Sequence, residues 1–219
     1  YVTVDGGQNW SKFTNNMPPV AVHYIAIQPE TSDLVLATHG RGIIIVDDIS
    51  PLRQITKDVI AQNTHFFKVR PTVLRDESPF AEGGDAGEFV GDNPNRSAKI
   101  IYYLKSRPTF GKTTLEVFDA SGKRVGDLVP GKSKGINIVN WNYRLNTPKV
   151  ATGKTFSFGG FAQPRLPEGT YTVKLTKGKD VYETKLELVP DPNSIHTADD
   201  RRIANETTMK LYGMSEQLA

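Results

Sequence analysis

The chain of 219 residues has 37% hydrophobic and 23% charged residues and a formal net charge of +3, which predicts one or two globular domains. Its Lys and Arg residues are dispersed, Cys is absent, and no apolar run approaches the roughly 20 residues that a membrane-spanning helix needs. We therefore predict no nucleic-acid partner, no membrane span, no disulfide and no cysteine-bound metal. Nineteen Gly and fourteen Pro residues favour short strands joined by turns, as in all-β proteins.

A tight polar hairpin is predicted for residues 1–10, where turn formers precede a tryptophan. Glycine takes positive φ easily, an Asp side chain accepts hydrogen bonds from nearby backbone N–H groups, and Trp10 would close the turn and bury its apolar face. The pattern resembles the Asp-box, or BNR repeat, of sialidases, sortilin-like receptors and related β-propellers, with an asparagine in place of the usual hydroxyl residue. The matching positions are Thr3, Asp5, Gly7 and Trp10. The resemblance implies a structural hairpin, and a lone carboxylate lacks the second group that glycoside hydrolysis requires.

One repeat-sized unit is predicted for residues 1–48. After the hairpin come three strand patterns separated by turns, at residues 21–27, 34–38 and 43–47. A four-stranded propeller blade takes roughly 40–45 residues. The stretch from Leu34 to Leu52 closely resembles the end of the propeller in secreted bacterial (Bacteroidetes-type) Asp-box proteins that are described as glycosyl-hydrolase-like. Residues 1–48 are therefore interpreted as the last blade of a β-propeller.

The polar side chains of this unit are candidates for anion binding, catalysis and metal binding. His39 and Arg41 lie in a Gly-rich turn, which would either be buried and bind an anionic ligand or, as the resemblance implies, close the blade. Asp47 and Asp48 are adjacent on a predicted strand, so their side chains point to opposite faces and cannot share a catalytic site. The histidines are scattered along the chain without metal-ligand spacing. No catalytic residue, metal site or cofactor is predicted in this chain.

Residues 49–98 are predicted to connect two domains. Ser50 fits the N-cap of a short helix over residues 50–61, with proline at the first helical position. A strand follows at residues 65–70, and residues 76–98 form a long surface loop rich in Gly, Asp, Glu and Asn. We expect the strand to pair with the next domain or to lie against it, because the apolar residues around Phe67 are unsuited to a free tether.

An immunoglobulin-like β-sandwich is predicted for residues 99–190. Six strand patterns with turns between them occur at residues 100–104, 114–118, 124–128, 136–141, 170–175 and 182–189. Their alternation predicts an inward-facing group made of Leu115, Val117, Trp141, Tyr171 and Val173. The segment resembles the immunoglobulin-like domain of the flagellar hook-capping protein, which secreted Bacteroidetes-type proteins reuse.

A Gly-rich insertion between two of these strands, residues 147–167, contains Phe156, Phe158 and Phe161. If exposed, these rings would form a contact patch for carbohydrate or protein. In the alternative interpretation they fold back on the adjacent blade and form the interdomain contact.

The last residues, 191–219, predict the start of a C-terminal helical segment, with Thr197 at the N-cap and a weak apolar stripe that Gly213 interrupts. The predicted fold class is therefore all-β, with one terminal propeller blade and an immunoglobulin-like sandwich, followed by a C-terminal helix.

The function predicted from the sequence is a non-catalytic, structural and binding module at the C-terminal end of a larger Asp-box propeller protein. Its expected partners are the remaining blades of the parent protein, in the same or a separate chain, because a repeat unit needs neighbours to bury its faces, and a glycan or protein ligand. In the alternative, the parent is a glycoside hydrolase acting on sialylated or plant glycans, with its catalytic residues upstream. The resemblance implies secretion, to the cell surface, exterior or periplasm.

Overall fold

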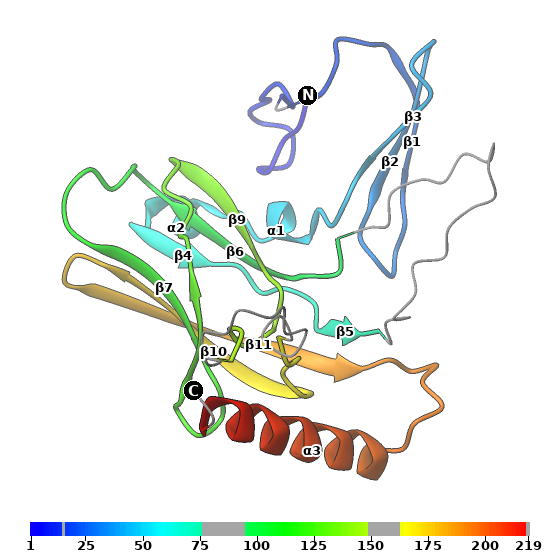
Figure 1. Cartoon of the computed structure of the whole chain (residues 1–219). Helices are drawn as coiled ribbons and strands as arrows, with labels where there is room; N and C mark the ends of the chain where they lie inside the picture. The colour runs from blue at the N-terminus through cyan, green and yellow to red at the C-terminus, as the bar shows by residue number, and fades with distance from the viewer. Residues whose placement is uncertain (15, 76–94, 149–162, 218–219) are drawn as a thin grey trace, which may run out of the picture. The chain divides into compact units, whose positions relative to one another are not determined.

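The computed structural model describes residues 1–14, 16–75, 95–148 and 163–217, and the chain forms two compact units. Unit 1 contains residues 1–69, 101–107 and 133–137, and unit 2 contains residues 70–100, 108–132 and 138–219. Strands β6 (Ala98–Leu104) and β9 (Gly135–Trp141) contribute residues to both units. Figure 1 shows the elements coloured along the chain.

The first sheet of unit 1 is antiparallel and has three strands in the order β1-β2-β3. Its members are β1 (Val22–Ile27), β2 (Leu34–Thr38) and β3 (Ile43–Val46). The turn between β2 and β3 closes where the Thr38 N–H donates to the carbonyl of Gly42, over 3.1 Å. Gly42 has a φ of +69°, which glycine adopts without strain. The sequence predicted all three strands to within one residue of their ends.

Two short helices follow this sheet, α1 (Ser50–Arg53) and α2 (Lys57–Ala61). The prediction of one continuous helix over residues 50–61 is therefore wrong. Thr56 has an extended backbone, and its hydroxyl accepts a hydrogen bond from the N–H of Val59 over 3.2 Å. A threonine hydroxyl that caps the residues after it starts a new helix.

The start of α1 also differs from the prediction. Ser50 is the first helical residue, and Ile49 occupies the N-cap without a side-chain hydrogen bond. The Asp48 carboxylate instead accepts from the Ser50 N–H over 3.1 Å. Because Asp48 satisfies one of the free N–H groups at the helix start, it has a capping role from one position further upstream.

A second sheet has the strand order β4-β6-β9. Strand β4 (Thr64–Phe66) pairs antiparallel with β6, where Thr64 lies opposite Leu104. The predicted pairing of this segment with a strand of the following region is confirmed. The strand ends earlier than predicted because the backbone of Lys68 is hydrogen-bonded to the side-chain amide of Gln54. The Gln54 amide NH2 donates to the Lys68 carbonyl, and the Lys68 N–H donates to the Gln54 amide oxygen, each over 2.9 Å.

Phe67 belongs to the core cluster of unit 1 and is 2% exposed. Its N–H still donates to the carbonyl of Ile101 over 2.9 Å. The other members of the cluster are apolar residues from α2, β6, β9 and the segments that precede α2 and follow β4: Ile55, Val59, Val69, Ile101, Tyr103 and Ile136. The connector is thus anchored at Phe67 and is not a free tether at that point.

Unit 2 is built on a five-stranded sheet in the order β5-β11-β10-β7-β8. Its strands are β5 (Thr72–Leu74), β7 (Thr113–Phe118), β8 (Arg124–Leu128), β10 (Gly169–Lys177) and β11 (Asp180–Pro190). Neighbours pair antiparallel, except that β5 runs parallel to β11, with Thr72 opposite Leu188. The sequence predicted every strand of this sheet except β5.

The core of unit 2 surrounds Trp141, which is 1% exposed. The indole makes an edge-to-face contact with Tyr171, with ring centroids 5.2 Å apart. Burial raises the pKa of Tyr171 to about 12, and its hydroxyl donates to the Pro167 carbonyl over 2.7 Å. The inward-facing group predicted from alternation is confirmed, since all its members are buried: Leu115, Val117, Trp141, Tyr171 and Val173.

The C-terminal helix α3 (Ala198–Gln217), red in Figure 1, ends the described chain. Thr197 and Asp200 cap its start reciprocally: the Thr197 hydroxyl accepts from the Asp200 N–H, and the Asp200 carboxylate accepts from the Thr197 N–H. The helix continues through Gly213. A single glycine disfavours a helix by only about 1 kcal/mol.

The described chain is thus mostly β, with several sheets and a C-terminal helix, as the sequence predicted. Phe156, Phe158, Phe161 and most of the predicted surface loop lie outside the described residues.

Candidate functional site

The N-terminal turn is held by a ring of hydrogen bonds from the residues that the Asp-box pattern singled out. The Thr3 hydroxyl donates to the Asp5 carboxylate over 2.8 Å and accepts from the Gly7 N–H over 2.9 Å. Asn9 donates to the same carboxylate through its backbone, over 3.0 Å, and through its side chain, over 2.7 Å. Both carboxylate oxygens of Asp5 therefore accept hydrogen bonds within the turn, which gives the side chain a structural role.

Trp10 closes the turn as predicted, because its indole N–H donates to the Gly7 carbonyl over 3.0 Å. The expectation that it buries its apolar face is wrong for this chain, since the side chain is 60% exposed.

Hydrogen bonds from Asn9, and then from Thr3, lower the pKa of Asp5 to about 2.

Acid is expected to open this turn only far below the ordinary aspartate pKa of about 3.9. Because the folded-state pKa is depressed, the stabilisation is complete above about pH 4 and is lost as the pH falls through about 2. NMR of the Trp10 indole N–H reports the opening, with the buried Trp141 indole as an internal control. The Asp5→Asn variant should lose the pH dependence. A wild-type midpoint near pH 4 would contradict the hydrogen-bonded geometry.

The turn that contains His39 and Arg41 is exposed at every position, and its role as a ligand-binding or blade-closing turn stays a prediction. The His39 N–H donates to the Ala21 carbonyl over 2.9 Å. The His39 ring lies beside that of His23, with centroids 5.1 Å apart and planes tilted by 37°. Sequence reasoning missed this pair because it depends on the register of two strands.

The β1-β2-β3 sheet has two apolar faces, which follow from its register and from the alternation of side chains along a strand. We call one of them the groove face: it carries Ile25, Ile27, Leu34, Leu36, Ile44 and Val46. A groove of about 720 Å³ lies on this side, lined by Ile25, Leu34 and Leu36 together with residues of the N-terminal segment and of α1.

The opposite side, which we call the open face, carries the apolar residues Tyr24, Ala26, Val35, Ala37, Ile43 and Ile45. Tyr24 is 70% exposed, Ile43 69% and Ile45 59%. Every residue of β1 is exposed. A sheet with one solvated face normally alternates polar and apolar residues, whereas a sheet covered on both faces is apolar throughout. This sheet has the composition of the second kind.

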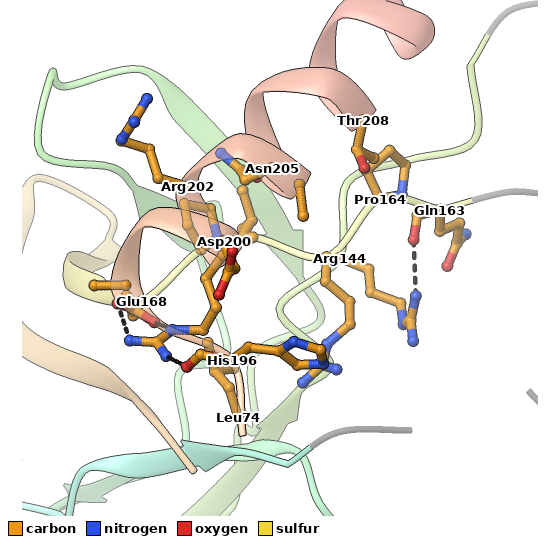
Figure 2. Close-up of a pocket in the computed structure, with 16 residues that line it drawn as sticks. Leu74, Arg144, Gln163, Pro164, Glu168, His196, Asp200, Arg202, Asn205 and Thr208 are labelled. Atoms are coloured by element: carbon orange, nitrogen blue, oxygen red, sulfur yellow. Dashed lines mark hydrogen bonds and ion pairs between the residues drawn. The ribbon is translucent and has the colours of Figure 1, made fainter. Parts of the chain in front are cut away.

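Unit 2 contains a cavity of about 840 Å³ beside the start of α3 (Figure 2). The helix contributes seven lining residues: Ala198, Asp200, Arg201, Arg202, Ala204, Asn205 and Thr208. The remaining lining comes from the chain around β5, from the segment after β9, and from the segment before β10: Leu74, Arg144, Gln163, Pro164, Arg165, Leu166, Pro167 and Glu168, with His196 before α3. The lining contains four arginine side chains and two carboxylate side chains.

The acidic side chains of the cavity already have partners. Glu168 forms a bidentate ion pair with Arg201, over 2.7 and 3.1 Å. Asp200 accepts from the backbone and hydroxyl of Thr197, over 2.8 and 2.7 Å, and these bonds lower its pKa. On the basic side, Arg202 is paired with Asp199 and Glu206 along the helix.

Sequence reasoning missed this cavity, because its arginines are scattered along the chain and form no motif. Within the described ranges, no three His, Asp or Glu side chains gather as a metal site. No helix there combines the length and apolar character needed to cross a bilayer.

Comparison with protein-family models gives no match, and no curated protein matches the chain. Among solved structures, the chain is similar to one described as PorZ, an essential bacterial surface component of the type-IX secretion system of Porphyromonas gingivalis. The TM-score is 0.29 and the identity 12%, and the match covers 76% of this chain and 16% of that chain. This chain therefore spans a small part of that protein's length, and a likeness at this level assigns neither family nor activity.

Proposed function

We propose that the chain is a non-catalytic structural and binding module of a larger Asp-box propeller protein. In this proposal residues 1–48 are the last propeller blade, residues 49–98 connect it to an immunoglobulin-like domain over residues 99–190, and a C-terminal helical segment follows. The module would belong to a secreted or cell-surface protein. The observation that carries the proposal is the open face of the β1-β2-β3 sheet.

The occupant of the open face is, in this proposal, the next sheet of the parent propeller. Blades of a propeller pack face to face, so a terminal blade without its neighbour exposes apolar side chains on the face that the neighbour would cover. Covering side chains such as Tyr24, Ile43 and Ile45 would stabilise the assembly by roughly 1.5–3 kcal/mol for each residue that becomes fully buried.

Hydrogen exchange tests the proposal directly. The parent protein and the 219-residue chain are compared at the backbone amides of β1 and β3. We expect slower exchange there in the parent, while the amides of β10 exchange alike in both and serve as an internal control. Equal exchange of β1 and β3 in the two proteins would contradict the proposal.

The chain itself offers a second test, because its open face should promote self-association. The double variant Ile43→Asp, Ile45→Asp should reduce both concentration-dependent association in sedimentation velocity and the binding of an apolar dye. The matched control is Ile138→Asp, which replaces an exposed isoleucine outside the open face. If the double variant associates as strongly as the wild type, the open face does not mediate the self-association.

A further inference from the structure

The cavity of unit 2 contains a cation, Arg165, that no carboxylate of the described residues neutralises. Arg165 donates through Nη1 to the Arg75 carbonyl over 3.0 Å, and its guanidinium lies over the Tyr143 ring, 5.5 Å from the centroid. Its Nη2 atom is buried and has no hydrogen-bond partner. Among the residues that the structure describes, no carboxylate forms an ion pair with it. A buried unsatisfied N–H on a charged group is unfavourable and rare in folded proteins.

Arg165 also lies opposite another arginine. Arg144 and Arg165 form an isolated antiparallel bridge, and both line the cavity. Like charges directly opposite each other in a β pair are destabilising. Arg144 donates through Nη1 to the Gln163 carbonyl over 2.8 Å, the contact drawn in Figure 2. Both guanidinium groups therefore donate to backbone carbonyls, Arg144 to that of Gln163 and Arg165 to that of Arg75.

The position of Arg165 is fixed by the core beneath it. Tyr143 is 4% exposed and stands edge-to-face against Trp141 at 6.5 Å. Tyr143 has a φ of +43°, a left-handed backbone that is unfavourable for a tyrosine. The Leu166 N–H donates to its carbonyl over 2.8 Å and ties the two chain segments together. The guanidinium is thus pre-organised, so that little conformational entropy is lost when a ligand binds.

We propose that this cavity binds a small organic molecule through a carboxylate group, with Arg165 as the principal cation. A guanidinium presents its N–H groups in a planar fork that matches a carboxylate. The volume of about 840 Å³ is that of a small-molecule site and far exceeds a single ion. Neutral polar side chains, Asn205 and Thr208, lie beside apolar ones such as Leu74 and Pro164, which suits a ligand body with both hydroxyl or amide groups and apolar surface. The inference concerns unit 2 and does not depend on the open face.

Two sources supply this chemistry, an acidic sugar and the C-terminal residue of a peptide. Calorimetric titration of the 219-residue chain with D-galacturonate and with N-acetyl-leucine probes them separately. Each is compared with its neutral counterpart, D-galactose and N-acetyl-leucinamide. We expect at least one acid to bind within about 10 mM, a range that covers recognition through a single group, and its neutral counterpart to bind at least about ten-fold more weakly. The acid that binds identifies the source.

The variant Arg165→Gln should weaken binding of that acid about ten-fold or more, because it removes a charge-assisted contact. Arg165→Lys retains the charge without the fork and should fall between the two. Arg124→Gln, on β8 of the same unit and outside the cavity lining, should bind like the wild type. Near-ultraviolet circular dichroism checks that the core around Trp141 is intact in each variant.

Three outcomes would overturn the proposal. The first is that neither acid binds the wild type, or that sulfate binds while both acids do not. The second is that each acid and its neutral counterpart bind equally. The third is that a folded Arg165→Gln variant binds as well as Arg124→Gln. The comparison of acids with their neutral counterparts uses the wild type alone, so it decides the question even if the variants at position 165 do not fold.

Discussion

Replacing Trp141 by alanine is expected to lower the free energy of unfolding of unit 2 by about 3–5 kcal/mol, the range for removing a large buried aromatic side chain. The side chain is 1% exposed and contacts the rings of Tyr143 and Tyr171. A Cβ atom placed on Gly126 would lie 3.1 Å from the indole nitrogen, so the pocket is filled up to the backbone of β8. The cavity left behind could close only if these neighbours moved.

Urea denaturation followed by circular dichroism measures the change. The chain offers a matched control in its other tryptophan, because Trp10 is 60% exposed and Trp10→Ala should change the stability of unit 2 by less than about 0.5 kcal/mol. If the two variants unfold at the same urea concentration, the register of β9 is wrong.

The second large effect is expected at Phe67. Phe67→Ala should destabilise unit 1 by about 3–5 kcal/mol, because the ring is 2% exposed and packs with Val59 and Ile101. The chain around it is held by the Gln54 amide and by the bond to the Ile101 carbonyl. In the wild type, residues 66–70 should therefore resist proteolysis and exchange their amides slowly.

Limited proteolysis with mass mapping, alongside thermal unfolding, tests this expectation. In Phe67→Ala, cleavage between residues 66 and 70 should become an early event. The matched control is Phe110→Ala, whose side chain is 91% exposed and whose loss should leave the cleavage pattern unchanged. Early cleavage of the wild type between residues 66 and 70 would refute the anchoring of the connector.

The strands were predictable wherever one face is buried. In β10 the residues Tyr171, Val173 and Leu175 alternate with polar ones, and that alternation alone places them in the core. Strand β5 was missed because it has three residues and pairs in parallel with β11, a contact far away in sequence that no local pattern reports. The helix over residues 50–61 was predicted as continuous because a threonine is tolerated inside a helix and also caps one.

The candidate sites were predictable only where the interactions are local. The hydrogen bonds of the N-terminal turn join residues two to four positions apart, so the sequence pattern contains them. The cavity of unit 2 depends on Arg144 and Arg165 lying opposite each other and on a helix that begins more than 30 residues later. The burial of Arg165 Nη2 and its lack of a hydrogen-bond partner arise only when these segments come together in the folded chain.

The way the chain is divided between its two units constrains how the protein is made. Unit 1 includes residues 101–107 and 133–137 as well as the first 69 residues, and Ile101 belongs to its core. A ribosome releases the chain from its N-terminal end, so unit 1 cannot gather all its segments until residue 137 has left the exit tunnel. By then the whole of β7 and β8, which belong to unit 2, has also emerged. Unit 1 can therefore have all its segments while unit 2 still lacks β10, β11 and α3, which follow residue 137. The exposed apolar strands β1 and β3 emerge well before Ile101, a residue that β6 contributes to the core cluster around Phe67.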